Sequence, residues 1–212
     1  SIIDPLFSNH ISLANLNGAK IALEFSTPEA AVQNILSLFE AKIDVVSGTT
    51  GWYNQLPIIE KSCNDNNTGF FYATNFSIGM NLVFELNKQL AKLIQRIDGY
   101  TVSISETHHT KKLDKPSGTA ITLAQTILKN HKLLDHWELD PQIVSENTLP
   151  VFSNREGDVV GLHTVQYQSN VDIITLKHEA LNRNGLAMGA LIAAQFLSGK
   201  KGVYTMDDLL SL

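Results

Sequence analysis

The segment from Glu106 to Ala120, ETHHTKKLDKPSGTA, brings together the residue types that proton transfer and anion binding require. His108 and His109 titrate near neutral pH, which suits general acid–base catalysis. Lys111 and Lys112 supply point charges for carboxylates and can act as general acids. Such a mixture in a short polar segment between apolar runs predicts a site that binds a dianionic small molecule and moves protons.

Ser117, Gly118 and Thr119 follow Pro116 and open a helix that we expect over residues 117–129. The N-terminus of a helix presents N–H groups and the positive end of the helix dipole, so it readily binds an anion. Gly118 would let a ligand approach the backbone closely. The alternative interpretation is a surface loop capped by Ser117, with histidines that are satisfied by their neighbours.

A metal site is a second alternative, because Glu106, His108, His109 and His163 could offer ligands. Metal-binding histidines usually lie at helical i, i+4 spacing or on separate elements. Adjacent histidines in a lysine-rich segment fit that pattern poorly, since the lysines would oppose the cation. We therefore predict no metal.

Two further polar segments follow expected β-strands. Gly48–Gly51 (GTTG) comes after an apolar strand at residues 43–47, and Ala73–Phe76 (ATNF) ends the next strand. Ligands of parallel sheets bind at the carboxyl ends of the strands. Hydroxyl and N–H groups there could bind a ribose, a nicotinamide amide or a phosphate, although a tight turn explains GTTG equally well.

Two isolated charged residues are weaker candidates. Asp4 ends an opening strand at residues 1–4, where an acidic residue of a dinucleotide-binding fold bonds the adenosine ribose. A turn aspartate before Pro5 is the simpler explanation. Arg183 lies in the turn Asn182–Gly185 and could clamp a carboxylate.

The elements that must position these residues fall into two parts. In the first part, strands alternate with helices, which predicts a doubly wound parallel sheet of the Rossmann-like α/β class. The expected elements there are strands 20–25, 43–47 and 70–73 and helices 28–42 and 55–64. The second part predicts an α+β domain with a mixed sheet. Its expected elements are helices 80–97, 117–129 and 186–197 and strands 100–105, 142–144, 159–168 and 171–178.

We expect a dinucleotide-binding domain at residues 1–78, with residues 185–212 as a candidate to return to it. Residues 79–184 would then form a substrate-binding and oligomerisation domain. The boundary falls near Ser77–Gly79, where a long helix begins.

Composition restricts the class of protein. The chain has 212 residues, 43% of them hydrophobic and 17% charged, which is ordinary for a globular enzyme. A net charge of −5 without a basic stripe argues against nucleic-acid binding. The single cysteine, Cys63, allows no disulfide within the chain, and no apolar run approaches the roughly 20 residues of a membrane span. We expect a cytoplasmic protein.

The pattern E-x-H-H-x-x-K-x-D-x-P-S-G-T-A closely resembles the signature of the 4-hydroxy-tetrahydrodipicolinate (dihydrodipicolinate) reductase family of bacterial lysine and diaminopimelate synthesis. Shorter segments are also similar to the family's motifs along nearly the whole chain. They are D-F-[ST]-x-P-E at Glu24–Glu29 with glutamate in place of aspartate, G-T-T-G at Gly48–Gly51, A-x-N-F-S at Ala73–Ser77 and R-x-G-x-x-x-G-x-H at Arg155–His163.

The resemblance implies an NAD(P)H-dependent reductase that converts 4-hydroxy-tetrahydrodipicolinate, a small dicarboxylate, to tetrahydrodipicolinate. It implies that His108 is the catalytic acid/base and Lys112 the proton donor. The implied substrate-binding residues are His109, Ser117, Gly118, Thr119 and Arg183. The implied cofactor-binding residues are Asp4, Gly48, Thr49, Thr50, Ala73, Thr74, Asn75 and Phe76. Asp4 without a neighbouring arginine leans toward NADH over NADPH, and the family implies a homotetramer.

One departure from the family is the absence of its glycine-rich phosphate loop, which by comparison lies in roughly 25 to 30 residues before Ser1. We expect weak cofactor binding and poor stability if the protein lacks them. Two alternatives follow from this departure. One is another dinucleotide-dependent dehydrogenase of the same architecture, and the other is a catalytically impaired fragment or ligand-binding domain.

Overall fold

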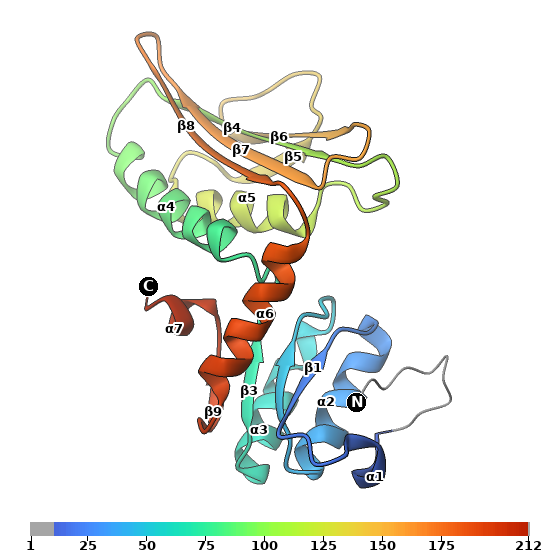
Figure 1. Ribbon diagram of the computed structural model, residues 1–212. Helices are drawn as coiled ribbons and strands as arrows, with labels where there is room; N and C mark the ends of the chain where they lie inside the picture. The colour runs from blue at the N-terminus through green and yellow to red at the C-terminus, as the bar shows by residue number, and fades with distance from the viewer. Residues whose placement is uncertain (1–10, 212) are drawn as a thin grey trace. The chain divides into compact units, whose positions relative to one another are not determined.

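The computed structural model describes residues 11–211, which divide into two compact units. The first unit contains the described residues up to Phe76 together with those from Leu186 onward, and the second contains Ser77–Gly185. Both sheets are visible in Figure 1. Asp4 and the strand expected at residues 1–4 lie outside the described residues.

The first unit contains a parallel four-stranded sheet in the order β1-β2-β3-β9. Its strands are β1 (Ile21–Glu24), β2 (Asp44–Ser47), β3 (Gly69–Tyr72) and β9 (Gly202–Tyr204). Its helical segments are α1 (Leu13–Leu16), α2 (Pro28–Glu40), η2 (Tyr53–Gln55), α3 (Leu56–Asn66) and α7 (Met206–Leu210), joined by most of α6 (Asn184–Leu197). The alternation of strands and helices predicted this sheet correctly, whereas α1, β9 and α7 were not predicted.

Helices pack on both faces of this sheet, as consecutive residues of β3 show. Phe70 belongs to the core formed with α2 and α3, and its ring lies 5.7 Å from that of Phe39. The next residue, Phe71, points to the other face, where its ring lies 6.1 Å from that of Phe196 on α6. The doubly wound α/β arrangement is therefore present.

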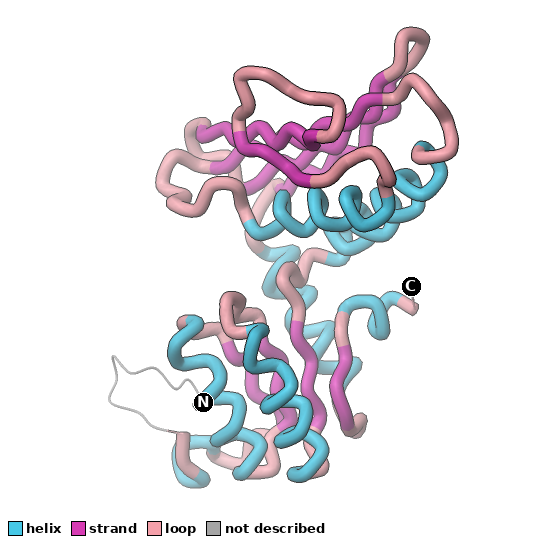
Figure 2. Tube along the Cα trace, turned by 180° about the vertical axis from the view of Figure 1, so that it is seen from behind, coloured by secondary structure: helices cyan, strands magenta, loops and turns pink. Residues whose placement is uncertain are grey.

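The second unit contains a five-stranded mixed sheet in the order β5-β6-β4-β7-β8. Its strands are β5 (His136–Leu139), β6 (Thr148–Arg155), β4 (Thr101–His108), β7 (Gly161–Gln168) and β8 (Ile173–Ala180). The central strand β4 is parallel to β6 and antiparallel to β7. Helices α4 (Ile78–Ile94) and α5 (Gly118–Asn130) lie side by side against one face, as Figure 1 and Figure 2 show.

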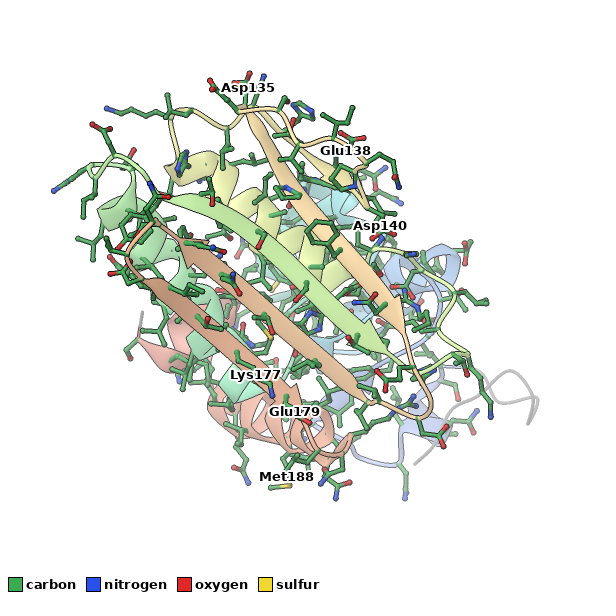
Figure 3. All side chains as sticks on the ribbon, turned by 90° about the horizontal axis from the view of Figure 1, so that it is seen from above. Asp135, Glu138, Asp140, Lys177, Glu179 and Met188 are labelled. Atoms are coloured by element: carbon green, nitrogen blue, oxygen red, sulfur yellow. The ribbon has the colours of Figure 1, made fainter. Side chains whose placement is uncertain are left out.

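The core of this unit lies between the two helices and the sheet. Alternate residues of β4, beginning with Val102 and Ile104, are buried there. The opposite face carries charged side chains such as Lys177 and Glu179 on β8, which form an ion pair at 2.9 Å and are labelled in Figure 3. Within residues 11–211, no helix combines the length and apolar character that crossing a membrane requires.

Two expectations for this unit were wrong. Residues 142–144 form no strand but part of the connection between β5 and β6, where Ile143 is 86% exposed. The strand expected to end at residue 105 continues to His108, so Glu106 and His108 belong to β4 and not to a loop. Polar side chains at its last two inward positions interrupt the hydrophobic alternation that marks a strand in the sequence.

Candidate active site

Glu106 occupies an inward position near the end of β4 and is 1% exposed. Its Oε1 accepts hydrogen bonds from the Ser117 backbone N–H (3.0 Å) and from Ser153 Oγ (2.6 Å). Its Oε2 accepts a hydrogen bond from Ser117 Oγ, and Arg155 Nη1 lies 3.7 Å from Oε1. Although burial raises the pKa of Glu106, these hydrogen bonds outweigh it and hold the pKa below the ordinary value. Glu106 is therefore a buried, ionised carboxylate.

His108 is the next inward residue of β4 and is 7% exposed. Its Nδ1 faces Glu106 Oε2 at 3.6 Å, and its ring meets the ring of His163 edge-to-face at 5.0 Å between centroids. Burial lowers the pKa of His108 below its ordinary value, opposed by Glu106 and reinforced by Lys112 and Arg155. At neutral pH the His108 imidazole is therefore mainly uncharged and can accept a proton.

His109 and Arg183 meet although they are distant in the sequence. His109 follows the end of β4, whereas Arg183 lies in the turn between β8 and α6. Arg183 Nη2 lies 3.2 Å from His109 Nε2, in an exposed position. The structure thus brings together these two predicted substrate-binding residues.

The segment after His109 is held in place by Arg155. The Arg155 guanidinium donates hydrogen bonds to the backbone oxygens of Lys112 (3.2 Å) and Asp114. Lys112 Nζ forms an ion pair with Asp114 Oδ1 at 2.7 Å. The predicted proton donor, Lys112, is therefore positioned by an acidic neighbour and by a braced backbone.

Ser117 caps α5 and is 3% exposed. Its Oγ accepts a hydrogen bond from the Ala120 N–H (3.2 Å), while its own N–H and hydroxyl donate to Glu106. Gly118 is exposed, and no atom lies within 4 Å of the position that a side chain would occupy. An anion that binds this helix N-terminus would therefore approach at Gly118 and the following residue, Thr119.

In the first unit, the two predicted cofactor segments meet at the carboxyl edge of the sheet. Gly48 follows β2 and Ala73 follows β3, and the Ala73 N–H donates to Ser47 O at 3.3 Å. Thr49 is buried and its Oγ1 accepts a hydrogen bond from the Ser26 N–H (2.8 Å), whereas Thr50 and Thr74 are exposed. The sheet edge thus gathers small and hydroxyl-bearing residues, as the sequence predicts.

Two aromatic rings and a buried carboxylate complete this edge. Phe25 is 57% exposed, and its ring lies 5.6 Å from the Phe76 ring. Glu24 is buried at the end of β1, where it accepts hydrogen bonds from Ser47 Oγ (2.8 Å) and from Ser26 Oγ. Glu24 was noted in the sequence only as a replacement of aspartate, so its bridge to β2 was not predicted.

Some members of the second-unit site were missed by sequence reasoning. Ser153 had no signal, since β6, the strand that carries it, was not predicted. Arg155 and Glu106 stood in recognisable motifs, but nothing in the sequence indicated that they meet. Their association depends on the pairing of β4 with β6, in which Glu106 lies opposite Ser153 and His108 opposite Arg155.

A potential metal-ligand cluster is present at this site. Ligand atoms of Glu106, His108 and His163 lie within 4.8 Å of one another. The carboxylate of Glu106 already accepts three hydrogen bonds, and the Arg155 guanidinium lies 3.7 Å from it. A guanidinium at that distance repels a cation, so the chemistry of the site favours hydrogen bonding and proton transfer over metal binding.

These features are typical of a class of protein, the two-unit α/β enzymes that combine a Rossmann-like unit with a mixed-sheet unit. The family description "Dihydrodipicolinate reductase, N-terminus" matches residues 4–76, and "Dihydrodipicolinate reductase, C-terminus" matches residues 79–210. The chain belongs to the dihydrodipicolinate reductase family.

Individual relatives agree with this assignment. Over 211 residues the chain is 47% identical to the 4-hydroxy-tetrahydrodipicolinate reductase of Christiangramia forsetii, covering 99% of this chain and 86% of that relative. It is 38% identical over 191 residues to the 4-hydroxy-tetrahydrodipicolinate reductase of Rickettsia rickettsii, covering 89% and 78%. The fold is shared with the dipicolinate-bound dihydrodipicolinate reductase of Paenisporosarcina sp. TG-14 (TM-score 0.74, 23% identity, 92% of this chain and 76% of that one).

Proposed function

We propose that this chain is an NAD(P)H-dependent 4-hydroxy-tetrahydrodipicolinate reductase, which forms tetrahydrodipicolinate in lysine and diaminopimelate biosynthesis. The family match over both units and the names of the relatives support this reaction. The observation that carries the proposal is the convergence of an acid–base histidine, His108, and a helix N-terminus on one buried carboxylate, Glu106. Lys112 lies close enough to His108 to lower its pKa.

The substrate is a ring that carries two carboxylates, so the site needs two anion-binding positions. The first turn of α5 supplies one, through Gly118 and Thr119 with Ser117 as the cap. His109 and Arg183 supply the other, where the guanidinium can hold a carboxylate with two parallel hydrogen bonds. These assignments explain why exposed and cationic groups flank the buried His108.

The carboxyl edge of the first sheet fits a nicotinamide cofactor, since Gly48 lies against the exposed Phe25 and the hydroxyl-bearing Thr50 and Thr74 are exposed after β2 and β3. Gly48, Thr49, Thr50 and residues 73–76 would hold the nicotinamide end. When bound, NAD(P)H supplies the hydride for the reduction. We favour NADH slightly over NADPH on account of Asp4, which lies outside the described residues.

Proton transfer falls to two side chains of the second unit. Lys112 donates a proton from Nζ, which Asp114 holds in position at 2.7 Å. His108, uncharged at neutral pH, accepts a proton and returns it during loss of the hydroxyl and reduction of the ring.

The division of the chain suggests a role for each unit. We assign cofactor binding to the first unit, and substrate binding and oligomerisation to the second. In the second unit, the sheet face opposite α4 and α5 is a suitable surface for assembly into a homotetramer (Figure 3). We infer a cytoplasmic enzyme that acts on a small molecule, without nucleic-acid or membrane partners.

The test is an assay of the full-length protein with 4-hydroxy-tetrahydrodipicolinate and either NADH or NADPH. We expect turnover that falls by about 10²-fold or more in Lys112→Ala and in His108→Ala. Wild-type turnover in both variants would overturn this mechanism. Other cyclic and 2-oxo acids serve as competing substrates, and preference for one of them would point to a different dehydrogenase of the same architecture.

A further inference from the structure

A row of polar side chains crosses the helix-covered face of the second sheet. Glu106 on β4 lies opposite Ser153 on β6 and His163 on β7, and His163 lies opposite His178 on β8. Glu106, Ser153 and His163 are buried, at 1%, 4% and 5% exposure. Burial of charged and polar groups is costly unless they are paired. The proposed reaction uses none of these four side chains, so the row requires an explanation.

Glu106 joins the two functional parts of the site. On one side it accepts hydrogen bonds from the N–H and hydroxyl of Ser117, which cap the helix proposed to bind a substrate carboxylate. On the other side its Oε2 faces Nδ1 of His108 at 3.6 Å. A single buried carboxylate therefore contacts both the anion-binding helix and the proton-transfer histidine.

Two imidazoles face the same carboxylate oxygen. Nδ1 of His108 and Nδ1 of His163 lie 3.6 and 3.9 Å from Glu106 Oε2, and neither buried nitrogen has a hydrogen-bond partner. A carboxylate attracts an N–H group and repels a lone pair, so it favours the proton on Nδ1 of His108. The other ring nitrogen, Nε2, is then left as the acceptor.

The motif R-x-G-x-x-x-G-x-H surrounds this arrangement. Arg155 neutralises Glu106 from β6, and His163 packs edge-to-face on the His108 ring from β7. A side chain at Gly161 would place its Cβ 3.3 Å from Nε2 of His108, which is tighter than an ordinary contact. Glycine at this position thus leaves room beside the nitrogen that would exchange protons.

We propose that Glu106 is a positioning residue, which keeps the Nδ1–H tautomer of His108 and fixes the N-terminus of α5 relative to it. His163 and Arg155 hold the carboxylate and the imidazole in place. This inference rests on the proposed function, because it gives Glu106 its purpose in the reaction of His108. A buried aspartate orients the histidine of the serine-protease triad by the same physical means.

The first test measures kinetics against pH for Glu106→Gln. The charged and titratable groups that act on His108 are Glu106, His163, Lys112, Asp114 and Arg155. Of these, Glu106 raises the pKa of His108 most, ahead of Asp114, so neutralisation of Glu106 moves the acidic limb of the kcat/KM profile to lower pH. We expect kcat to fall at least ~10-fold, as part of the contribution of acid–base catalysis is lost.

Matched variants separate positioning from general damage. Glu106→Asp keeps the charge, so its acidic limb should stay near that of the wild type even if kcat falls. Asp172→Asn removes a hydrogen-bonded carboxylate beyond the opposite end of β7, where it accepts from Tyr100 Oη (2.6 Å), and should leave both kcat and the pH profile unchanged. If the wild type is active and Glu106→Gln keeps both the wild-type kcat and the wild-type acidic limb of kcat/KM, the inference is overturned.

A second measurement determines the tautomer of His108 in the wild-type protein itself. The ¹⁵N chemical shifts of the histidine rings in the wild-type protein report which nitrogen carries the proton. We expect His108, assigned by comparison with His108→Gln, to have its proton on Nδ1 at neutral pH. A proton on Nε2 would contradict the inference even if the protein is an active reductase, whereas an inactive wild type would contradict the proposed function.

Discussion

The hydroxyl of Ser117 donates a hydrogen bond to the buried carboxylate of Glu106, so the first turn of α5 and the end of β4 are held by one contact. The two residues are eleven positions apart, and the segment between them carries Lys112. This contact makes the loop a closed structure whose two ends cannot separate without exposing a buried charge. The helix cap and the acid–base site are therefore linked energetically.

Removal of the Ser117 hydroxyl should destabilise the protein. Ser117→Ala loses a helix cap, at a cost of ~1–2 kcal/mol, and leaves Glu106 with one hydrogen bond fewer, at ~1–3 kcal/mol. Urea unfolding would measure the change. Thr126→Ala, which removes a hydroxyl bonded to Thr122 O within the same helix (2.8 Å), should change stability by less than ~0.5 kcal/mol. Equal effects of the two substitutions would contradict the linkage.

The stability of the protein should depend on pH through His163. Burial, the largest cause, lowers the pKa of His163 from 6.5 to about 4 in the folded protein. The folded state therefore favours the neutral imidazole. The contribution of neutral His163 to the free energy of unfolding is complete above pH 6.5 and is lost as the pH falls toward 4. It amounts to at most about 3 kcal/mol.

His163→Gln tests this dependence, because glutamine does not titrate. Unfolding free energies between pH 4 and 7 should fall less steeply toward acid in the variant than in the wild type. His136→Gln, at an exposed position of β5, is the control and should retain the wild-type slope. A slope in His163→Gln equal to that of the wild type would show that the buried imidazole does not control acid stability.

The sequence predicted the architecture well where local patterns are strong. Strands β1, β2 and β3 and helices α2 and α3 show alternating apolar runs with helix starts such as Thr27-Pro28, and each was found within a few residues. β5 and β6 were missed because Pro150 and polar residues interrupt their pattern, although both strands pair with neighbours along their length. Strand pairing between distant segments leaves little trace in a local pattern.

The site residues that lie close together in the sequence could be predicted. His108, His109 and Lys112 stand close together in one segment, so their association is visible in the sequence. The contact between His109 and Arg183 spans 74 positions and depends on where β4 and β8 end in the sheet. The carboxylate network is likewise set by the register of β4 with β6 and β7, which no residue spacing reveals.

Arg183 should act mainly in substrate binding. Lysine retains the charge but cannot form two parallel hydrogen bonds with a carboxylate, so Arg183→Lys should raise KM about 10-fold with a smaller change in kcat. Steady-state kinetics with varied substrate would measure both constants. Arg96→Lys, at an exposed position just after α4, provides the matched control. A fall in kcat without a rise in KM would place Arg183 in the chemical step instead.

Gly48 should be intolerant of a side chain because of Phe25. In Gly48→Ala the new Cβ would lie 2.1 Å from Cε1 of Phe25, so the ring must move away from the proposed nicotinamide position. We expect NADH affinity, measured by calorimetry on the full-length protein, to fall ~10-fold, as for a loss of about 1.4 kcal/mol.

The clash depends on the Phe25 ring, so a double variant tests it. In a Phe25→Leu background, Gly48→Ala should lower NADH affinity by less than it does in the wild type. Gly185→Ala, where no atom lies within 4 Å of the added Cβ, should bind NADH as the wild type does. Unchanged NADH affinity in Gly48→Ala would show that the Phe25 ring can move without affecting cofactor binding. This edge of the sheet would then not bind the cofactor through the Phe25 ring.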